Sequence, residues 1–139
     1  MTHLVVDASV AAKWVLPEED TDAAERLLRP EYRLLAPDLI YAEFGNIIWK
    51  HNSRGLLDMD KAAARVQRFL TAPLQVYPSK PFLLQAVDLA IQTRRTVYDC
   101  LYVALAIREG CQMVTADRRL VNALAGGPLE RYVRWIGGM

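Results

Sequence analysis

The sequence has little cysteine, almost no net charge and no long apolar run. Its two cysteines, Cys100 and Cys111, form neither a CxxC pair nor part of a zinc ligand set. A disulfide-stabilised fold is therefore not expected, and a reducing cytoplasm is the predicted location. The net charge of +1 argues against a generally basic nucleic-acid coat protein, while it leaves a local basic face open.

No segment has the character of a membrane span or a secretion signal. The longest unbroken apolar stretch runs from Cys100 to Ile107, far short of the ~20 residues that cross a bilayer. The first residues contain no basic segment followed by a long apolar region. No membrane partner is expected. Repeats, low-complexity tracts and Gly/Ser/Pro-rich linkers are missing too, so residues 1–139 are expected to form a single domain.

Short apolar segments alternate with longer helical ones along the chain. The short segments lack strict apolar–polar alternation, which is typical of strands covered on both faces. Five strands are expected, at Leu4–Val6, Arg33–Ala36, Leu74–Tyr77, Gln112–Thr115 and Tyr132–Ile136. Helices are expected at Ala8–Leu16, Glu18–Leu28, Pro37–Asn52, Asp58–Leu70, Ser79–Thr93, Tyr98–Glu109 and Asp117–Ala125. This order predicts an α/β domain with a mostly parallel central sheet.

Four carboxylates occupy positions where a negative charge is costly. Asp7 and Asp117 each follow a predicted strand and precede a helix, and ligands bind at the carboxyl ends of parallel strands. Asp99 lies on the inward face at the start of its helix. Glu43 lies within the apolar stripe of its own helix, where an ionised group is expensive without a partner. Each acid also has an ordinary interpretation: Asp7, Asp99 and Asp117 as helix N-caps, and Glu43 as the partner of a buried arginine or as a residue at the rim of the stripe.

The four acids together favour a metal site. The sheet and its covering helices are able to bring them to one edge, where two like charges ~5 Å apart repel by about 3 kcal/mol at an effective dielectric of ~20. Oxygen-only ligands suit Mg²⁺ or Mn²⁺, and such ions support phosphodiester hydrolysis. His3 and His51 each stand alone, so no zinc site is indicated.

Four ordered motifs resemble those of the PIN-domain ribonucleases, and specifically the VapC-type toxins of toxin–antitoxin pairs. The first is Val5–Val10, and the second is Ala36–Leu39 leading to Ala42 and Glu43. The third, Tyr98–Ala106, is the most distinctive, and the fourth is Thr115–Asp117. Each motif alone is weak. Their order and spacing agree along nearly the whole chain.

The resemblance implies a three-layer α/β/α sandwich and an acidic pocket made of Asp7, Glu43, Asp99 and Asp117 that binds Mg²⁺ or Mn²⁺. The implied activity is metal-dependent cleavage of single-stranded regions of RNA. The implied partners are a small VapB-type antitoxin that blocks the pocket and a second copy of the chain in a homodimer. Some relatives carry a further acid after the last motif, where Arg118 and Arg119 stand here. The number of metal ions therefore stays open.

Roles follow for the residues around the acids. Asp7, Asp99 and Asp117 are expected to hold the main metal ion, and Glu43 to position or deprotonate the attacking water. Ser9 or Thr115 is expected to orient a carboxylate or that water by hydrogen bonding. Candidate phosphate contacts, chosen because each lies near a motif, are Lys13, Arg94, Arg95, Arg118 and Arg119.

Other functions remain as alternatives. A receiver-like signalling domain needs an acceptor Asp at the end of a middle strand, but that strand here ends Val76-Tyr77-Pro78. A dinucleotide-binding domain needs a G-x-G-x-x-G turn, which the segment after Val6 lacks. A PIN nuclease of RNA processing and a non-catalytic PIN interaction module are the closer alternatives.

Overall fold

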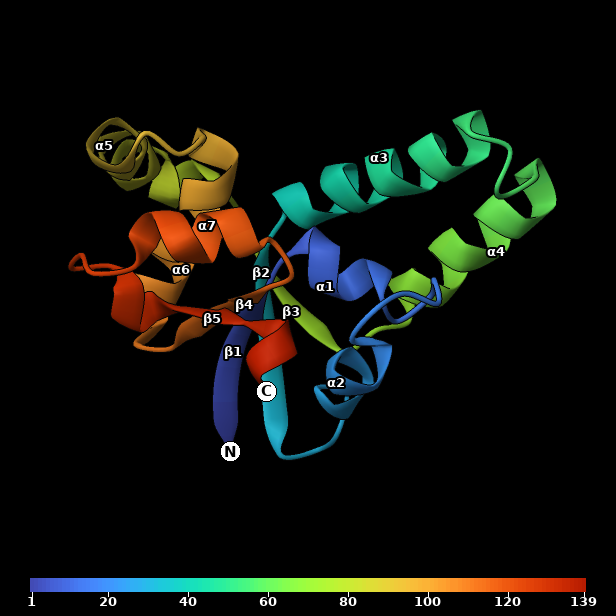
Figure 1. The fold of residues 1–139 in the computed structure, drawn as a ribbon, viewed down its shortest axis with the longest axis horizontal. Helices are drawn as coiled ribbons and strands as arrows, with labels where there is room; N and C mark the ends of the chain where they lie inside the picture. Colours follow the sequence, from blue (N-terminus) through green and yellow to red (C-terminus); the bar gives the residue numbers. More distant parts are fainter.

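A five-stranded parallel sheet forms the centre of the computed structural model, which describes all 139 residues (Figure 1). The strands run in the order β3-β2-β1-β4-β5, and every neighbouring pair is parallel. Their bounds are β1 Thr2–Val6, β2 Tyr32–Pro37, β3 Leu74–Tyr77, β4 Gln112–Thr115 and β5 Val133–Trp135. Strand β1 is therefore central, and its carboxyl end lies between those of β2 and β4.

Helices cover both faces of the sheet, as the three-layer prediction requires. On one side α6 packs against β1, β2 and β4, and α5 packs against α6. Helices α1 and α2, with the hairpin of α3 and α4, lie on the other side (Figure 1). Their bounds are α1 Ala8–Ala12, α2 Thr21–Arg26, α3 Leu39–Ser53, α4 Met59–Leu70, α5 Leu83–Thr93, α6 Val97–Glu109 and α7 Arg118–Leu124. Short 3₁₀ turns occupy Lys80–Phe82, Glu130–Tyr132 and Ile136–Gly138.

The core explains why α6 carries the longest apolar run of the chain. Every residue from Cys100 to Ala106 is buried, because this helix lies between the sheet and α5 and meets protein on nearly all sides. The buried apolar residues of the sheet and helices form one contiguous cluster of 37 side chains. None of the helices is both long and apolar enough to cross a membrane.

The first two helices are shorter than the sequence predicts. Helix α1 ends at Ala12 instead of Leu16, because the N–H groups of Lys13, Trp14 and Val15 turn back to carbonyls three residues earlier. Trp14 then donates to the carbonyl of Ala24 over 2.9 Å, which fixes the chain in this turn.

The prediction of an acidic first turn at Glu18–Asp20 is wrong. Helix α2 begins only at Thr21, and Asp20 precedes it with a left-handed backbone at φ 60°. The hydroxyl of Thr21 donates to the Glu18 carbonyl, so the segment before α2 is a closed turn.

The helix ends follow the predicted signals in most places. Asp58 caps α4 through the N–H of Lys61, and Gly110 ends α6 in the left-handed conformation at φ 64°. Ser79 does not cap α5 directly, because its hydroxyl donates to Asp38 and a 3₁₀ turn intervenes.

Candidate active site

Asp7 is the most buried of the four acids and stands directly after β1. Its side chain is 9% exposed and accepts hydrogen bonds at both carboxylate oxygens. Ser9 Oγ donates to Oδ1 over 2.5 Å, and Thr115 Oγ1 donates to Oδ2 over 2.5 Å. The Val10 N–H also donates to Oδ1, so Asp7 caps α1 as well. Helix α1 and strand β4 thus fix this carboxylate between two hydroxyls.

Glu43 reaches the same edge from α3. Its Oε1 accepts a 2.6 Å hydrogen bond from the hydroxyl of Tyr102, which lies in α6. Tyr102 is 2% exposed, so its hydroxyl has no bulk water to bond instead. Glu43 forms no ion pair, so the interpretation of this residue as half of a buried ion pair is not met: its partner is a phenol.

Asp99 and Asp117 share one basic neighbour. Arg95 places Nη2 3.4 Å from Asp99 Oδ2 and 3.9 Å from Asp117 Oδ2. Thr96, not Asp99, caps α6, and its hydroxyl accepts from the Asp99 N–H. Asp117 does cap α7, because its Oδ1 accepts from the N–H groups of Arg119 and Leu120.

The acids raise one another's affinity for protons. Burial raises the pKa of Asp7, Glu43 and Asp99, in each case as the main cause. The negative charge of Asp99 adds to this for both Asp7 and Glu43. The negative charge of Asp117 likewise raises the pKa of Asp99. All four acids therefore belong to one electrostatic cluster at the carboxyl edge of the sheet.

Hydrogen bonds and one ion pair offset part of this rise. The hydroxyls of Ser9 and Thr115 pull the pKa of Asp7 down, although burial outweighs them. Arg95 pulls the pKa of Asp99 down in the same way, yet the net shift stays upward. Burial, followed by the charge of Glu43, raises the pKa of Tyr102, so its hydroxyl keeps its proton and acts as a donor.

The donor set fits a hard divalent cation in its chemistry. All four side chains offer oxygen, and their mutual repulsion is the charge that Mg²⁺ or Mn²⁺ neutralises. Their spacing does not yet fit an ion. In the present side-chain conformations, no three of these groups lie close enough together to hold one. Arg95 lies against two of them, and hydroxyls hold the other two. Binding therefore requires a change in side-chain contacts.

The five predicted phosphate contacts are distributed unevenly. Arg95 contacts two of the acids. Arg94 and Arg119 are exposed and lie close in sequence to Arg95 and Asp117. The Arg118 guanidinium stacks 3.9 Å from the centre of the Trp135 ring. Lys13 is 6% exposed, and its Nζ donates to the Glu19 carbonyl over 2.6 Å and to Glu18. The structure thus directs Lys13 toward its own loop.

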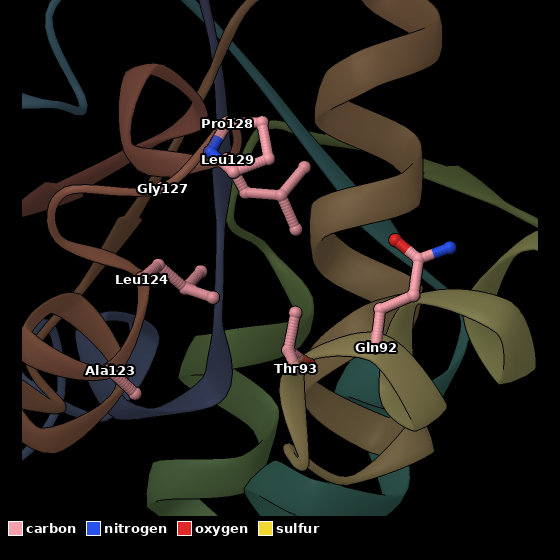
Figure 2. A pocket seen from close by; sticks show the side chains of 7 residues that line it. All are labelled: Gln92, Thr93, Ala123, Leu124, Gly127, Pro128 and Leu129. Carbon is pink, nitrogen blue, oxygen red and sulfur yellow. The ribbon is translucent and has the colours of Figure 1, made fainter.

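A separate cavity of about 300 Å³ lies between the end of α5 and residues 123–129. Gln92 and Thr93, at the end of α5, form one wall, and Leu124, Pro128 and Leu129 face them (Figure 2). None of its lining residues is charged, and none of the four acids lines it. It is not the acidic site.

Two participants in the site have roles that the sequence did not predict. The pairing of Tyr102 with Glu43 and that of Arg95 with two acids both depend on contacts between separate elements. Helical spacing gave one usable signal, because Tyr102 follows Asp99 by three residues and shares its face.

Comparison with known proteins gives the same fold and places the chain in a family. A model of the PIN domain matches residues 4–125. Ribonuclease VapC3 of Pyrobaculum aerophilum is 41% identical over 122 residues, which cover 86% of this chain and 92% of that protein.

Solved structures agree over nearly the whole length. The crystal structure of PAE2754 from Pyrobaculum aerophilum has a TM-score of 0.74 at 23% identity and covers 99% of this chain and 85% of that one. VapBC2 from Rickettsia felis, bound to a DNA fragment from its promoter, has a TM-score of 0.65 at 12% identity, with 96% and 98% covered. At these identities the two structures establish the fold.

The all-parallel sheet with helices on both faces is the fold of a PIN domain. The chain belongs to the PIN-domain family and, within it, to the VapC ribonucleases. The predicted α/β/α architecture and the predicted class, a metal-dependent ribonuclease toxin, are confirmed. The signalling and dinucleotide-binding alternatives are thereby removed.

Proposed function

We propose that this VapC ribonuclease hydrolyses phosphodiester bonds in single-stranded RNA at the carboxyl edge of β1, β2 and β4. One observation carries the proposal: Asp7, Glu43, Asp99 and Asp117 form a single electrostatic cluster there, and the pKa of three of them is raised. Such a cluster lowers the stability of the fold when its acids are ionised and no cation is bound. We therefore attribute the cluster to the binding of a cation.

Asp7, Asp99 and Asp117 would hold a divalent ion, Mg²⁺ or Mn²⁺, with Glu43 beside it. When bound, that ion supplies charge for the leaving oxygen and lowers the pKa of water. The chain itself orients the groups: Ser9 and Thr115 keep Asp7 in place through its two oxygens. Tyr102 leaves one oxygen of Glu43, Oε2, without a protein donor, and that oxygen is available to accept a proton from the attacking water.

Basic side chains beside the cluster support an RNA substrate. Arg94 and Arg119 are exposed, so their guanidinium groups are free to contact RNA phosphates. Such contacts make RNA binding weaker as the salt concentration rises. Arg118 remains a candidate through its exposed face, although Trp135 restricts its movement. Lys13 is the weakest of the five because its ammonium is buried and bonded.

The proposed protein partners are a VapB-type antitoxin and a second copy of the chain. Two groups of exposed apolar side chains support two such interfaces. One group lies on α3, α4 and the turn between them and comprises Tyr41, Trp49, Leu56, Met59 and Leu70. The other lies on α5 and comprises Leu83, Leu84 and Ile91.

RNA cleavage by the purified chain tests the proposal. We expect cutting of single-stranded RNA with Mg²⁺ or Mn²⁺, no cutting in EDTA, and none with Asp99→Asn. Asp88→Asn is the matched control, because Asp88 is an acid on α5 outside the cluster. Cleavage that persists in EDTA, or in a folded Asp99→Asn protein, contradicts the assigned chemistry.

A further inference from the structure

Arg95 is placed unusually for a residue that binds RNA. Its guanidinium contacts Asp99 and Asp117 at the same time, and these two acids belong to different elements, α6 and the turn before α7. It is the only cation that forms an ion pair with any of the four acids. The position between two carboxylates is also the one that a divalent ion would need.

The contacts that hold Arg95 are few and long. The distances of 3.4 and 3.9 Å exceed those of a good charge-assisted hydrogen bond, which are about 2.7–2.9 Å. The Nε–H of Arg95 is buried and has no hydrogen-bond partner. Such an orphaned donor costs free energy, so this arrangement of the side chain is not a tightly bound one.

Arg95 lies in the short turn between α5 and α6. Arg94 ends α5 with a left-handed backbone at φ 59°, and Thr96 caps α6. Only the turn between two helices therefore carries the guanidinium.

From this geometry we infer that Arg95 is an internal counter-ion that occupies the metal site in the metal-free protein and is displaced when a divalent cation binds. The inference rests on the proposed function, since it concerns the same four acids. In the metal-free chain the guanidinium offsets part of their repulsion. On binding, the cation takes over Asp99 and Asp117, and Arg95 turns outward with its charge free to meet a phosphate. Metal binding and RNA affinity are then coupled through one side chain.

Metal affinity measured by isothermal titration calorimetry tests the inference directly. Mn²⁺ is titrated into the full chain, freed of EDTA, and into Arg95→Gln. We expect Arg95→Gln to bind Mn²⁺ roughly three- to ten-fold more tightly, because two partly exposed ion pairs no longer compete with the metal. Arg94→Gln is the matched control: it removes the same charge one residue away, at a side chain without an acidic partner. Its affinity should stay within about two-fold of the unmodified chain.

The unmodified chain offers a second readout, which follows Arg95 itself as the metal binds. In ¹⁵N spectra, the Arg95 Nε–H signal is assigned by its absence from Arg95→Gln. It should move on addition of Mg²⁺ with the same apparent Kd as a calorimetric titration of the unmodified chain with Mg²⁺. A signal that does not move, or an Arg95→Gln protein with unchanged or weaker Mn²⁺ affinity, overturns the inference.

These outcomes separate the inference from the proposed function. If the unmodified chain binds Mn²⁺ and cuts RNA while Arg95→Gln binds no more tightly, the counter-ion role is wrong and the nuclease site stands. If the unmodified chain binds no divalent cation, the proposed metal site fails and the counter-ion role fails with it.

Discussion

Tyr102 and Glu43 are 59 residues apart in sequence and joined by a 2.6 Å hydrogen bond. The phenol comes from α6 on one face of the sheet, and the carboxylate comes from α3, which follows β2. This bond connects two elements at the rim of the site. It also leaves the second oxygen of Glu43 without a protein donor, and this is the oxygen that we propose accepts a proton from the attacking water.

Tyr102→Phe should therefore weaken both stability and cleavage. Removing the hydroxyl leaves a half-buried carboxylate without its donor, which costs about 1–3 kcal/mol of unfolding free energy at neutral pH. Urea unfolding of Tyr102→Phe, Glu43→Ala and the double variant measures the coupling between the two residues, because alanine offers the hydroxyl no acceptor. Strictly additive effects of the two substitutions would show that the hydrogen bond is not formed in solution.

Asp7→Asn should abolish cleavage while the fold is kept. An amide retains an acceptor for Ser9 and the Val10 N–H, and the Thr115 hydroxyl is able to rotate to face the amide nitrogen. The negative charge needed for a metal ligand is lost. Circular dichroism and RNA cleavage measured on the same preparation check this. A folded variant that hydrolyses RNA at the original rate removes Asp7 from the site.

The same variant should show how pH acts on the metal-free protein. Burial raises the pKa of Asp7, so the folded chain holds that proton more tightly than the unfolded chain does. The stabilising contribution of protonated Asp7 is therefore complete below the pKa of the unfolded chain, about 4, and is lost as pH rises through the folded value.

In EDTA, Asp7→Asn should thus have a higher Tm than the unmodified chain at pH 7, and the difference should shrink toward pH 4. Differential scanning calorimetry across this range measures it. Saturating Mg²⁺ should narrow the gap at pH 7, because the cation stabilises only the folded unmodified chain. A difference that is constant with pH contradicts the raised pKa.

The salt dependence of RNA binding should distinguish Arg119 from Lys13. Arg119 is exposed at the start of α7, whereas Lys13 is buried and bonded to its own loop. Arg119→Gln should lower the slope of log K against log salt by about 0.7, the value for one phosphate contact on a single strand. Lys13→Gln should leave the slope unchanged and reduce stability instead. The slopes are measured by fluorescence anisotropy of labelled RNA at several salt concentrations. All variants carry Asp99→Asn as well, so that the RNA is not cut during the titration.

The strands were predictable because each is a short apolar run closed by a residue that ends it. Asp7 follows β1, Pro37 ends β2 and Pro78 follows β3, so the sequence itself marks the carboxyl edge of the sheet. Helix lengths were less predictable. The apolar pattern of α1 continues through Trp14 and Val15, but those residues are buried in a turn, and periodicity does not distinguish the two.

The acids of the site were identifiable from the sequence, while their partners were not. Glu43 is conspicuous because a charge interrupts an apolar stripe, and Asp7 and Asp117 because they follow strands. The partners Tyr102 and Arg95 depend on how α6 and the preceding turn pack against other elements, which no local pattern encodes. The cap and site interpretations of Asp7 and Asp117 do not exclude each other, because each carboxylate caps a helix and also belongs to the acidic cluster.

The central place of β1 has a consequence for how the protein is made. Asp7 leaves the ribosome early, but its hydrogen-bond donor Thr115 lies 108 residues later, on the strand that completes the edge. At about 5–20 residues per second, the two are separated by roughly 5–20 s of synthesis. A nascent chain that stops before β4 has no assembled site, so the translating ribosome itself delays the appearance of an active toxin until most of the chain exists.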